Sequence, residues 1–372
     1  MTLDPAVAGT LGVVHVVGTG LLGTSIGLGL AGTSARVTLA DPSPTALALA
    51  RDLGAGAVGS GEQEPSLVVV AAPPDVTADV VAAQLDRFPA ATVTDVASVK
   101  AGVLRELTHR GVDLSRYVGG HPMAGRERSG PVAARGDLFL GRPWVVCPTT
   151  TSDPERVDAV RRLALALGAV PTTMSPQDHD AAVARVSHAP QVAASLVAAR
   201  LRHAPDAAVA LAGQGLRDVT RIAGSDPMLW AQILAANAGP VVEVLRELRG
   251  DLDGVITALD ALAKEQPGEP AAGGRSAVAR AVADGNLGRD RIPGKHGGSP
   301  TVYAVVTVLV PDQPGSLGRL FADIGAAGAN VEELTLEHAP GRAVGLGEVS
   351  VLPSVREALE ESLAAAGWHV VA

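Results

Sequence analysis

The chain is poor in aromatic residues and has a single cysteine. Its 372 residues include three Trp, two Tyr and three Phe, although 47% of them are hydrophobic. The core is therefore expected to consist of Ala, Val and Leu side chains. The lone Cys147 excludes an internal disulfide and a metal site built from several cysteines, and it fits a cytoplasmic location. No metal site is predicted.

Positive charge is also scarce. The 30 Lys and Arg residues against 39 Asp and Glu give a net charge of −9. Binding to nucleic acid relies on Lys and Arg, so nucleic acid is not expected as a partner. Charge of either sign is missing from Pro5 to Ala35, but glycines and His15 interrupt this run and no basic segment precedes it. A buried strand and a packed helix explain the run, so neither a membrane span nor a signal peptide is expected.

What the chain does contain is a glycine-rich turn between an expected strand and an expected helix. The apolar run Leu11 to Val17 leads into Gly18-Thr19-Gly20-Leu21-Leu22-Gly23. In a dinucleotide site the first glycine allows a tight turn, the second lets backbone approach the pyrophosphate, and the third lets the helix pack on the strand. The helix N-terminus offers N–H groups to the phosphates. The predicted cofactor-binding residues are Gly18, Gly20, Leu21, Leu22, Gly23, Asp41 and Pro73.

Asp41 selects between the two nicotinamide cofactors. It ends the second apolar run, Ala35 to Ala40, and no basic residue follows it directly. An acid here accepts hydrogen bonds from the ribose 2′-hydroxyl of NAD and repels the 2′-phosphate of NADP. The expected cofactor is NAD.

Four regions follow from the pattern along the chain. Alternating strands and helices over residues 10–173 predict an α/β, Rossmann-like, doubly wound dinucleotide-binding domain. Residues 174–265 show helical spacing and no strand signal, which predicts an all-helical domain for substrate binding and dimerisation. Its expected helices are Pro176 to Leu201, Ala207 to Ala212, Pro227 to Leu248 and Leu252 to Lys264. Residues 266–300 are rich in Gly, Pro and Arg and indicate a linker or an arm. Residues 301–372 predict a small α+β domain.

Two polar residues follow neighbouring expected strands of the first domain. Ser98 comes after the strand Ala91 to Val96, and His121 comes after the short strand Tyr117-Val118. Ligands of a parallel sheet bind beyond the carboxyl ends of its strands, so both side chains are expected near the nicotinamide. A histidine there suits the role of acceptor for a hydroxyl proton. By position alone, a loop histidine with a structural hydrogen bond explains His121 equally well.

Six segments then make the chain recognisable. They are Gly18 to Gly23, Thr94 to Lys100, Gly119 to Gly130, His179-Asp180 with Ser187-His188-Ala189-Pro190, Arg217 to Ala223, and Ser225 to Trp230. In this order they resemble the prephenate/arogenate dehydrogenase family of tyrosine biosynthesis. The chain is similar to those members of the family that have a C-terminal ACT domain. The resemblance implies NAD-dependent oxidative decarboxylation of prephenate to 4-hydroxyphenylpyruvate, or of arogenate to tyrosine.

The resemblance also implies roles for single residues. Ser98 and His121 match the pair that contacts the ring hydroxyl, with His121 as its proton acceptor. Arg221 matches the arginine that holds a substrate carboxylate, and His188 matches a histidine that faces the substrate. Arg217 falls where the family carries a basic residue near the site entrance.

Several alternatives stay open at this point. The segment Gly213-Gln214-Gly215-Leu216 departs from the family pattern, which leaves the pocket wall undetermined, and Arg126, Glu127 and Arg128 do not decide between prephenate and arogenate. A β-hydroxy acid dehydrogenase and a cofactor-binding amino-acid sensor are the competing functions. Asp218 and Arg221 have the spacing of a surface pair. Asp178-His179-Asp180 fits helix capping better than a metal cluster, and Trp230 and Cys147 fit core positions.

The last domain carries Asp312-Gln313-Pro314-Gly315-Ser316-Leu317, with Asn330 at the start of a later strand. This resembles the ACT signature, a turn whose backbone binds small amino acids between paired domains. The resemblance implies a homodimer regulated by an amino acid, with tyrosine as the expected effector and Asp312, Pro314, Gly315 and Asn330 as its site. A ferredoxin-like domain that only dimerises is the alternative.

Overall fold

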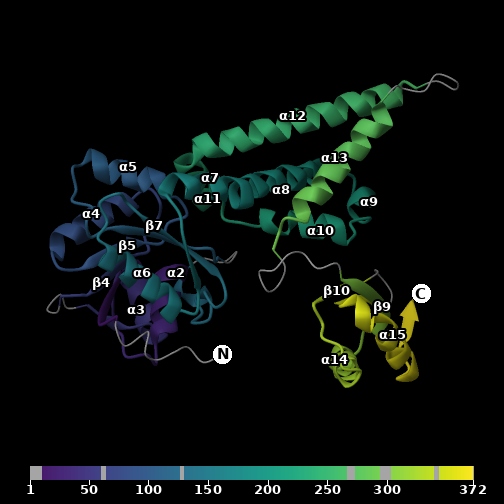
Figure 1. Ribbon diagram of the computed structural model, residues 1–372, viewed down its shortest axis with the longest axis horizontal. Coiled ribbons are helices and arrows are strands. Elements are labelled where there is room, and N and C mark those ends of the chain that lie inside the picture. The colour runs from purple at the N-terminus through teal and green to yellow at the C-terminus, as the bar shows by residue number, and fades with distance from the viewer. Residues whose placement is uncertain are drawn as a thin grey trace. The chain divides into compact units, whose positions relative to one another are not determined.

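The computed structural model describes residues 11–59, 64–125, 130–265, 273–293, 303–338 and 343–371. The chain forms two compact units, Met1–Leu248 and Arg249–Ala372. The division falls inside the long helix α12 (Ala238–Ala263), which is labelled in Figure 1.

The first unit opens with a parallel sheet of five strands in the order β3-β2-β1-β4-β5. These strands are β1 (Val13–Val17), β2 (Arg36–Ala40), β3 (Ala57–Val58), β4 (Leu67–Val70) and β5 (Thr92–Asp95). The order is that of a dinucleotide-binding sheet. The helices that connect the strands are α2 (Leu21–Leu30), α3 (Pro44–Asp52) and α4 (Thr77–Arg87), and α5 (Ala101–His109) follows β5.

Strand β4 shows why the sheet is covered on both faces. All four of its residues are buried, and they alternate between two hydrophobic clusters. Leu67 and Val69 pack in the cluster that includes residues of α2, whereas Val68 and Val70 pack in the cluster that includes residues of α4 and α5. An uninterrupted apolar strand is what a parallel sheet between two helical layers requires. The predicted α/β, Rossmann-like fold is confirmed.

The second sheet of this unit differs from the expected pattern. It contains β6 (Val118–Pro122), β7 (Pro143–Pro148) and β8 (Val170–Thr173), and β6 pairs with β7 in antiparallel fashion. A single bridge between Val93 and Tyr117 joins it to β5. Because β6 continues to Pro122 opposite Trp144, His121 lies inside a strand instead of in the loop that was expected. Helix α6 (Pro154–Ala166) connects β7 and β8.

The helical part contains two breaks that the sequence pattern does not reveal. The expected helix Pro176 to Leu201 is divided into α7 (Pro176–Val183), a π-helical turn (Ala184–His188) and α8 (Ala189–Arg200). The expected helix Pro227 to Leu248 ends as α11 (Pro227–Ala236), turns by 96° at the buried Asn237, and continues as α12. The expected break before Leu252 is absent, since α12 runs to Ala263. The shorter elements are α9 (Asp206–Val209), α10 (Gln214–Thr220) and three-residue turns at Leu201–His203 and Arg221–Ala223.

No single helix in the described ranges is long and apolar enough to cross a membrane; by length and composition, only the bent pair α11 and α12 reaches the limit together.

The second unit contains an antiparallel sheet in the order β10-β11-β9-β12. Its strands are β9 (Ala304–Pro311), β10 (Glu333–His338), β11 (Val344–Val351) and β12 (His369–Val371), and its helices are α14 (Ser316–Ala326) and α15 (Arg356–Ala365). Alternate residues of β9, Val306, Val308 and Val310, are buried against both helices. The predicted α+β fold is confirmed. Helix α13 (Gly274–Arg289) occupies much of the stretch expected to be a linker or an arm.

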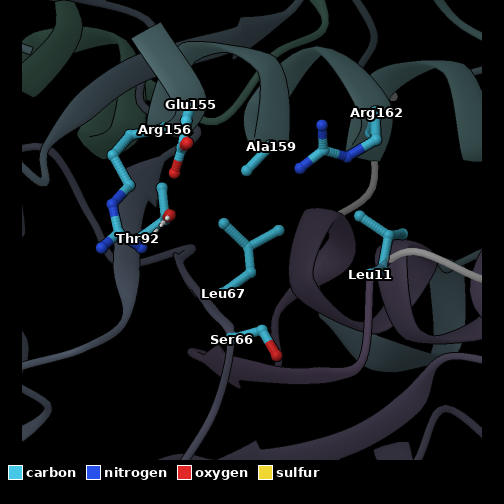
Figure 2. Close-up of a pocket in the computed structure, with 8 residues that line it drawn as sticks. All are labelled: Leu11, Ser66, Leu67, Thr92, Glu155, Arg156, Ala159 and Arg162. Carbon is cyan, nitrogen blue, oxygen red and sulfur yellow. Dashed lines mark hydrogen bonds between the residues drawn. The ribbon is translucent and has the colours of Figure 1, made fainter. Parts of the chain in front are cut away.

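A pocket of about 170 Å³ lies at the amino ends of the parallel strands. Figure 2 shows that Ser66 and Leu67, at the start of β4, and Thr92, at the start of β5, face side chains of α6. Arg156 donates to the carbonyl oxygen of Ala90 and to Thr92 Oγ1. Ligands of parallel sheets bind at the carboxyl ends of the strands. This pocket lies at the opposite ends, between α6 and the sheet, so we do not assign it to the cofactor or the substrate.

Candidate active site

The glycine turn has the geometry that a dinucleotide needs. Gly18 has φ of +99°, and a β-carbon there would overlap the carbonyl oxygen of Ala71, while one at Gly23 would overlap the carbonyl oxygen of Gly18. A β-carbon at Gly20 would meet nothing within 4 Å, so the backbone has open space beside it. Helix α2 begins at Leu21 and directs its N-terminal N–H groups toward that space. The residues present therefore fit a bound pyrophosphate.

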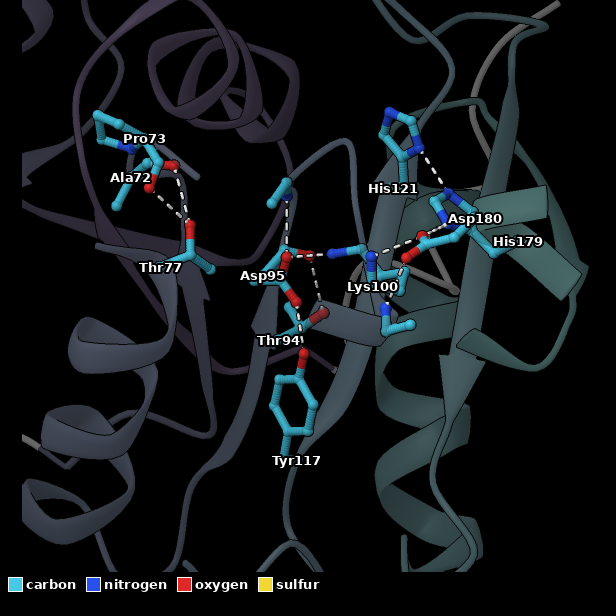
Figure 3. A network of polar contacts seen from close by, with 12 residues as sticks. Ala72, Pro73, Thr77, Thr94, Asp95, Lys100, Tyr117, His121, His179 and Asp180 are labelled. Carbon is cyan, nitrogen blue, oxygen red and sulfur yellow. Dashed lines mark hydrogen bonds and ion pairs between the residues drawn. The ribbon is translucent and has the colours of Figure 1, made fainter. Parts of the chain in front are cut away.

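Asp41 lies against this turn. Its Oδ2 accepts hydrogen bonds from the backbone N–H of Thr19 at 2.6 Å and from Thr19 Oγ1 at 2.9 Å, and its Oδ1 accepts from the N–H of Ser43 at 2.7 Å. The carboxylate is thereby held at the end of β2, where a ribose would lie. Pro73 lies in the loop after β4, and its carbonyl oxygen accepts a hydrogen bond from Thr77 Oγ1 at 2.9 Å (Figure 3).

A buried polar cluster lies where β5 and β6 meet. Asp95 is fully buried and forms an ion pair with Lys100, which is 1% exposed. The same carboxylate accepts from the hydroxyl of Tyr117 at 2.7 Å and from the N–H of Ala97 at 2.9 Å (Figure 3). Burying a charge is costly unless its hydrogen-bonding groups are satisfied, and this arrangement gives both oxygens of the Asp95 carboxylate donors. The cluster fixes the half-buried Ser98 within the loop that joins β5 to α5.

His121 is 8% exposed and is bonded to a second histidine. Its Nδ1 lies 2.8 Å from Nε2 of His179 (Figure 3). Burial lowers the pKa of His121 well below 6.5, and the nearby His179, Lys100 and His188 lower it further. The ring is therefore neutral at physiological pH. Within the described contacts its Nε2 has no hydrogen-bond partner, so this nitrogen is available as a base.

His179 and Asp180, at the middle of α7, belong to this site. Asp180 accepts hydrogen bonds from the backbone N–H groups of Lys100 at 2.8 Å and Ala101 at 2.9 Å, and from Nδ1 of His179 at 2.8 Å. Two acids of Asp178-His179-Asp180 thus lie at helix starts: Asp180 accepts from the first N–H groups of α5, and Asp178 accepts from the hydroxyl of Ser175, the N-cap of α7. Asp180 thus joins the helical part to the loop that carries Ser98.

His188, the last residue of the π-helical turn, is 1% exposed. Its Nδ1 lies 3.0 Å from Nδ2 of Asn237, and its ring packs edge-on against Trp230 at 6.0 Å between centroids. Burial lowers the pKa of His188 to about 4, with His179 lowering it and Asp180 opposing. Trp230, expected in the core, is half-buried beside a site histidine.

The two arginines of the predicted site are exposed on neighbouring elements. Arg217 is on α10, and Arg221 begins the turn that follows it. Both elements contact α8, the helix that starts directly after His188. The structure thus brings His121 and His188 together around His179 and Asp180, and it places the arginines on the adjoining segment. Gln214 donates to Asp218 at 2.8 Å. Arg126, Glu127 and Arg128 lie outside the described residues.

The residues predicted to bind an effector lie in the second unit. Gly315 has φ of +89° and precedes α14. The N–H of Ser316 donates to the carbonyl oxygen of Gln313 at 3.2 Å, so one turn N–H is used within the turn itself. Asn330 donates from Nδ2 to Glu332 Oε1 at 2.7 Å. The backbone N–H of Asp312 donates to the carbonyl oxygen of Ala343. Pro314 lies between Asp312 and Gly315 in the same turn.

Family models match most of the first two regions. Residues 28–172 match the nucleotide-binding domain of prephenate dehydrogenase, and residues 175–267 match its dimerization domain. The chain belongs to the prephenate dehydrogenase family. The predicted family, the enzyme class of oxidoreductase and a nucleotide-binding N-terminal domain are thereby confirmed. The matched ranges end at residue 267, before the C-terminal sheet.

One relative extends this match over nearly the whole chain, and two solved structures extend it over three quarters. A probable prephenate dehydrogenase of Streptomyces niveus, NovF, is 38% identical over 95% of this chain and 98% of its own length. A crystal structure of the Aquifex aeolicus prephenate dehydrogenase, in complex with hydroxyphenyl propionate and NAD+, is 28% identical and has a TM-score of 0.65, over 75% of this chain and 98% of its own. The Synechocystis arogenate dehydrogenase is 26% identical with a TM-score of 0.61, over 75% and 99%.

Proposed function

We propose that this chain oxidises prephenate with NAD and releases carbon dioxide and 4-hydroxyphenylpyruvate. The observation that carries the proposal is the buried, neutral His121 on β6. A bridge just before β6 joins it to β5, the strand that leads into Ser98, and the same unit contains the dinucleotide turn. The likeness to NovF and to the NAD+-bound A. aeolicus enzyme supports both the substrate and the cofactor.

The cofactor would be held by the glycine turn and Asp41. Gly18 and Gly23 shape the turn, Gly20 leaves room for the pyrophosphate, and the first residues of α2, Leu21 and Leu22, present the helix N-terminus. When bound, NAD supplies the hydride acceptor. Asp41 would accept from the ribose hydroxyls, and its charge disfavours a 2′-phosphate.

In the proposed reaction, the chain orients a substrate whose aromatisation drives the chemistry. His121 Nε2 takes the proton of the ring hydroxyl while the carbon that carries it loses hydride, and the ring carboxylate leaves as carbon dioxide. Ser98 hydrogen-bonds the same hydroxyl. Arg221 holds a substrate carboxylate with its planar guanidinium, and Arg217 adds positive charge at the entrance. The protein thus contributes orientation and a positioned base.

The test follows NADH formation by the purified full chain with prephenate, arogenate and a β-hydroxy acid as separate substrates. The proposal expects prephenate to have the highest kcat/KM. A higher kcat/KM with arogenate would make the chain an arogenate dehydrogenase, and activity with the β-hydroxy acid alone would overturn the proposal. Binding of NAD without turnover of any of the three would indicate a sensor. For the His121→Asn variant discussed below, His109→Asn, at the exposed end of α5, serves as the control for loss of one histidine.

Assembly, location and regulation belong to the same proposal. The match to a dimerization domain supports a homodimer. A cytoplasmic location is supported by the free, buried Cys147, whose thiol pKa burial raises to about 12. The turn Asp312 to Ser316 and Asn330 support binding of an amino acid, with tyrosine, the pathway product, as the proposed effector.

A further inference from the structure

Asp180 is the point at which hydrogen bonds to two histidines of the site converge. Its carboxylate accepts from His179, which bonds His121, and its backbone carbonyl accepts from Nδ2 of Asn237 at 2.8 Å. That same Nδ2 lies 3.0 Å from His188 Nδ1. His121 and His188 are thus each one side chain away from Asp180.

We propose that Asp180 fixes the protons of the two histidines in opposite positions, so that His121 presents a bare Nε2 and His188 presents an Nε2–H. The inference rests on the proposed function only for the roles that the two Nε2 atoms have toward the substrate. The proton positions themselves follow from which atoms can donate.

The branch to His121 starts at the carboxylate. Asp180 also accepts two backbone N–H groups at the N-terminus of α5, one on each carboxylate oxygen, so both oxygens act as acceptors. A carboxylate only accepts, so the proton between it and His179 lies on His179 Nδ1. In the proposed arrangement this is the one ring proton of His179, so its Nε2 accepts and the proton of the next hydrogen bond lies on His121 Nδ1 (Figure 3). The Nε2 of His121 carries a lone pair.

The branch to His188 starts at the backbone carbonyl of Asp180. A carbonyl oxygen only accepts, so the end of the Asn237 side chain that faces it is the NH₂ group. The second hydrogen of that group is directed to His188 Nδ1, which must accept it. With a pKa of about 4, His188 is neutral and has one ring proton, which is therefore on Nε2.

The two breaks in the helical part produce this arrangement. The π-helical turn ends at His188, and the 96° bend between α11 and α12 lies at Asn237. Single-turn π-helices of this kind occur often at functional sites. Without either break, the two side chains would continue along regular helices and the contact that fixes the proton of His188 would be lost.

The opposite settings give the histidines different partners in the substrate. His121 accepts the hydroxyl proton. His188 donates to an oxygen that has a lone pair, such as a keto or carboxylate oxygen, and has nothing to offer an ammonium group.

Ring nitrogen shifts of the free enzyme test the proton positions directly. The full chain is labelled with ¹⁵N-histidine, and long-range ¹H–¹⁵N correlations at neutral pH are assigned by the loss of signals in His121→Asn and His188→Asn. The expected result is Nδ1–H with bare Nε2 for His121 and Nε2–H with bare Nδ1 for His188. The same tautomer at both residues, or the reverse pair, would overturn the proposal. Because no substrate is present, this outcome is independent of the proposed reaction.

Two variants of His179 separate a positioning role from a structural one. His179→Gln keeps an amide oxygen to accept from His121 and an NH₂ group to donate to Asp180, whereas His179→Leu keeps neither. The expected result is that Leu lowers kcat about ten- to hundredfold, because it leaves buried polar groups of His121 and Asp180 without a partner, and mixes the His121 tautomers. Gln should restore most of both. Equal kcat and an unchanged His121 spectrum in the folded Leu variant would contradict the role of His179.

Discussion

The two α/β units of this chain carry their candidate ligand sites in opposite environments. In the first unit, Asp95, Lys100, Asp180 and His121 are buried and belong to one hydrogen-bond network, which reaches His121 through His179. In the second unit, Asp312 and Asn330 lie on exposed turns whose polar groups bond mostly to local neighbours. A buried polar network holds its groups in fixed positions and is costly to disrupt. An exposed turn is stabilised by few interactions, so a substitution there is expected to change ligand binding more than folding.

This difference suits chemistry in one unit and regulation in the other. Removing a proton from a substrate hydroxyl requires a base of fixed orientation, which burial provides. An effector site needs only a change in free energy between two states of the enzyme. Substitutions in the first unit are therefore expected to change turnover or folding, and those in the second to change the response to a ligand.

The largest effect is expected for the base itself. His121→Asn keeps a polar side chain of similar shape but has no basic nitrogen, so kcat should fall by about 10² to 10⁴. Binding of NAD, measured by quenching of tryptophan fluorescence, should be nearly unchanged. Turnover close to that of the unmodified chain would assign the base to another residue.

The buried ion pair is the next test. Lys100→Met leaves the Asp95 carboxylate uncompensated and should lower the free energy of unfolding by about 3–5 kcal/mol. Adding Asp95→Asn removes that charge and should recover much of the loss, measured by urea denaturation of both variants. Equal stability of Lys100→Met and the unmodified chain would show that the pair is not what holds the loop of Ser98.

The effect at the edge of the site is smaller. Asp41→Ser removes a charge-assisted hydrogen bond to the ribose, which contributes about 1.5–3 kcal/mol. The KM for NAD should rise by about tenfold to a hundredfold, and discrimination against NADP should relax. If the unmodified chain turned over faster with NADP at low cofactor concentration, Asp41 would not have this role.

Lowering the pH should reduce the free energy of unfolding of the first unit. His15, His121 and His188 all have a pKa below 6.5, chiefly because of burial. Between those values and 6.5 the unfolded chain binds more protons than the folded chain, so stability rises with pH. The stability contributed by these neutral rings is fully present above pH 6.5 and is lost as the pH falls toward 4. Melting temperatures from pH 8 to pH 4.5 check this, with His203→Gln, at an exposed histidine, as the control. A melting temperature independent of pH would contradict the neutral state of these rings.

The same contrast explains which features the sequence could predict. Local patterns were enough for the apolar β4, the glycine turn and Asp41, because each depends on neighbours in the chain. The bonds of His179 to His121 and of Asp180 to the start of α5 join residues 58 and about 80 positions apart. Helical periodicity contains no signal for them. One cue was available: His179 and Asp180 are adjacent near the start of an expected helix, and polar side chains that become buried need hydrogen-bond partners.

The break at Asn237 was missed for a related reason. Its surroundings have continuous helical spacing, and the 96° turn is stabilised by bonds to Asp180 and His188, which are distant in sequence. The extension of β6 through His121 likewise depends on pairing with β7, about 24 residues later. Tertiary partners determined these elements, and a single sequence does not display them.

The smallest effect is expected at the exposed turn of the second unit. Asn330→Ala removes one neutral hydrogen bond to an amino-acid effector, which should weaken its binding by about 0.5–1.5 kcal/mol, or roughly three- to tenfold. Gly315 is a poorer target, because its φ of +89° strains any other residue whether or not a ligand binds. Initial rates with prephenate and NAD are measured against added tyrosine, phenylalanine and tryptophan. Glu333→Ala, at an exposed position in the same sheet, is the control. A tyrosine response that shifts to higher concentration in Asn330→Ala alone would place the effector at this turn, whereas no response to any of the three in the unmodified chain would leave the domain with assembly as its role.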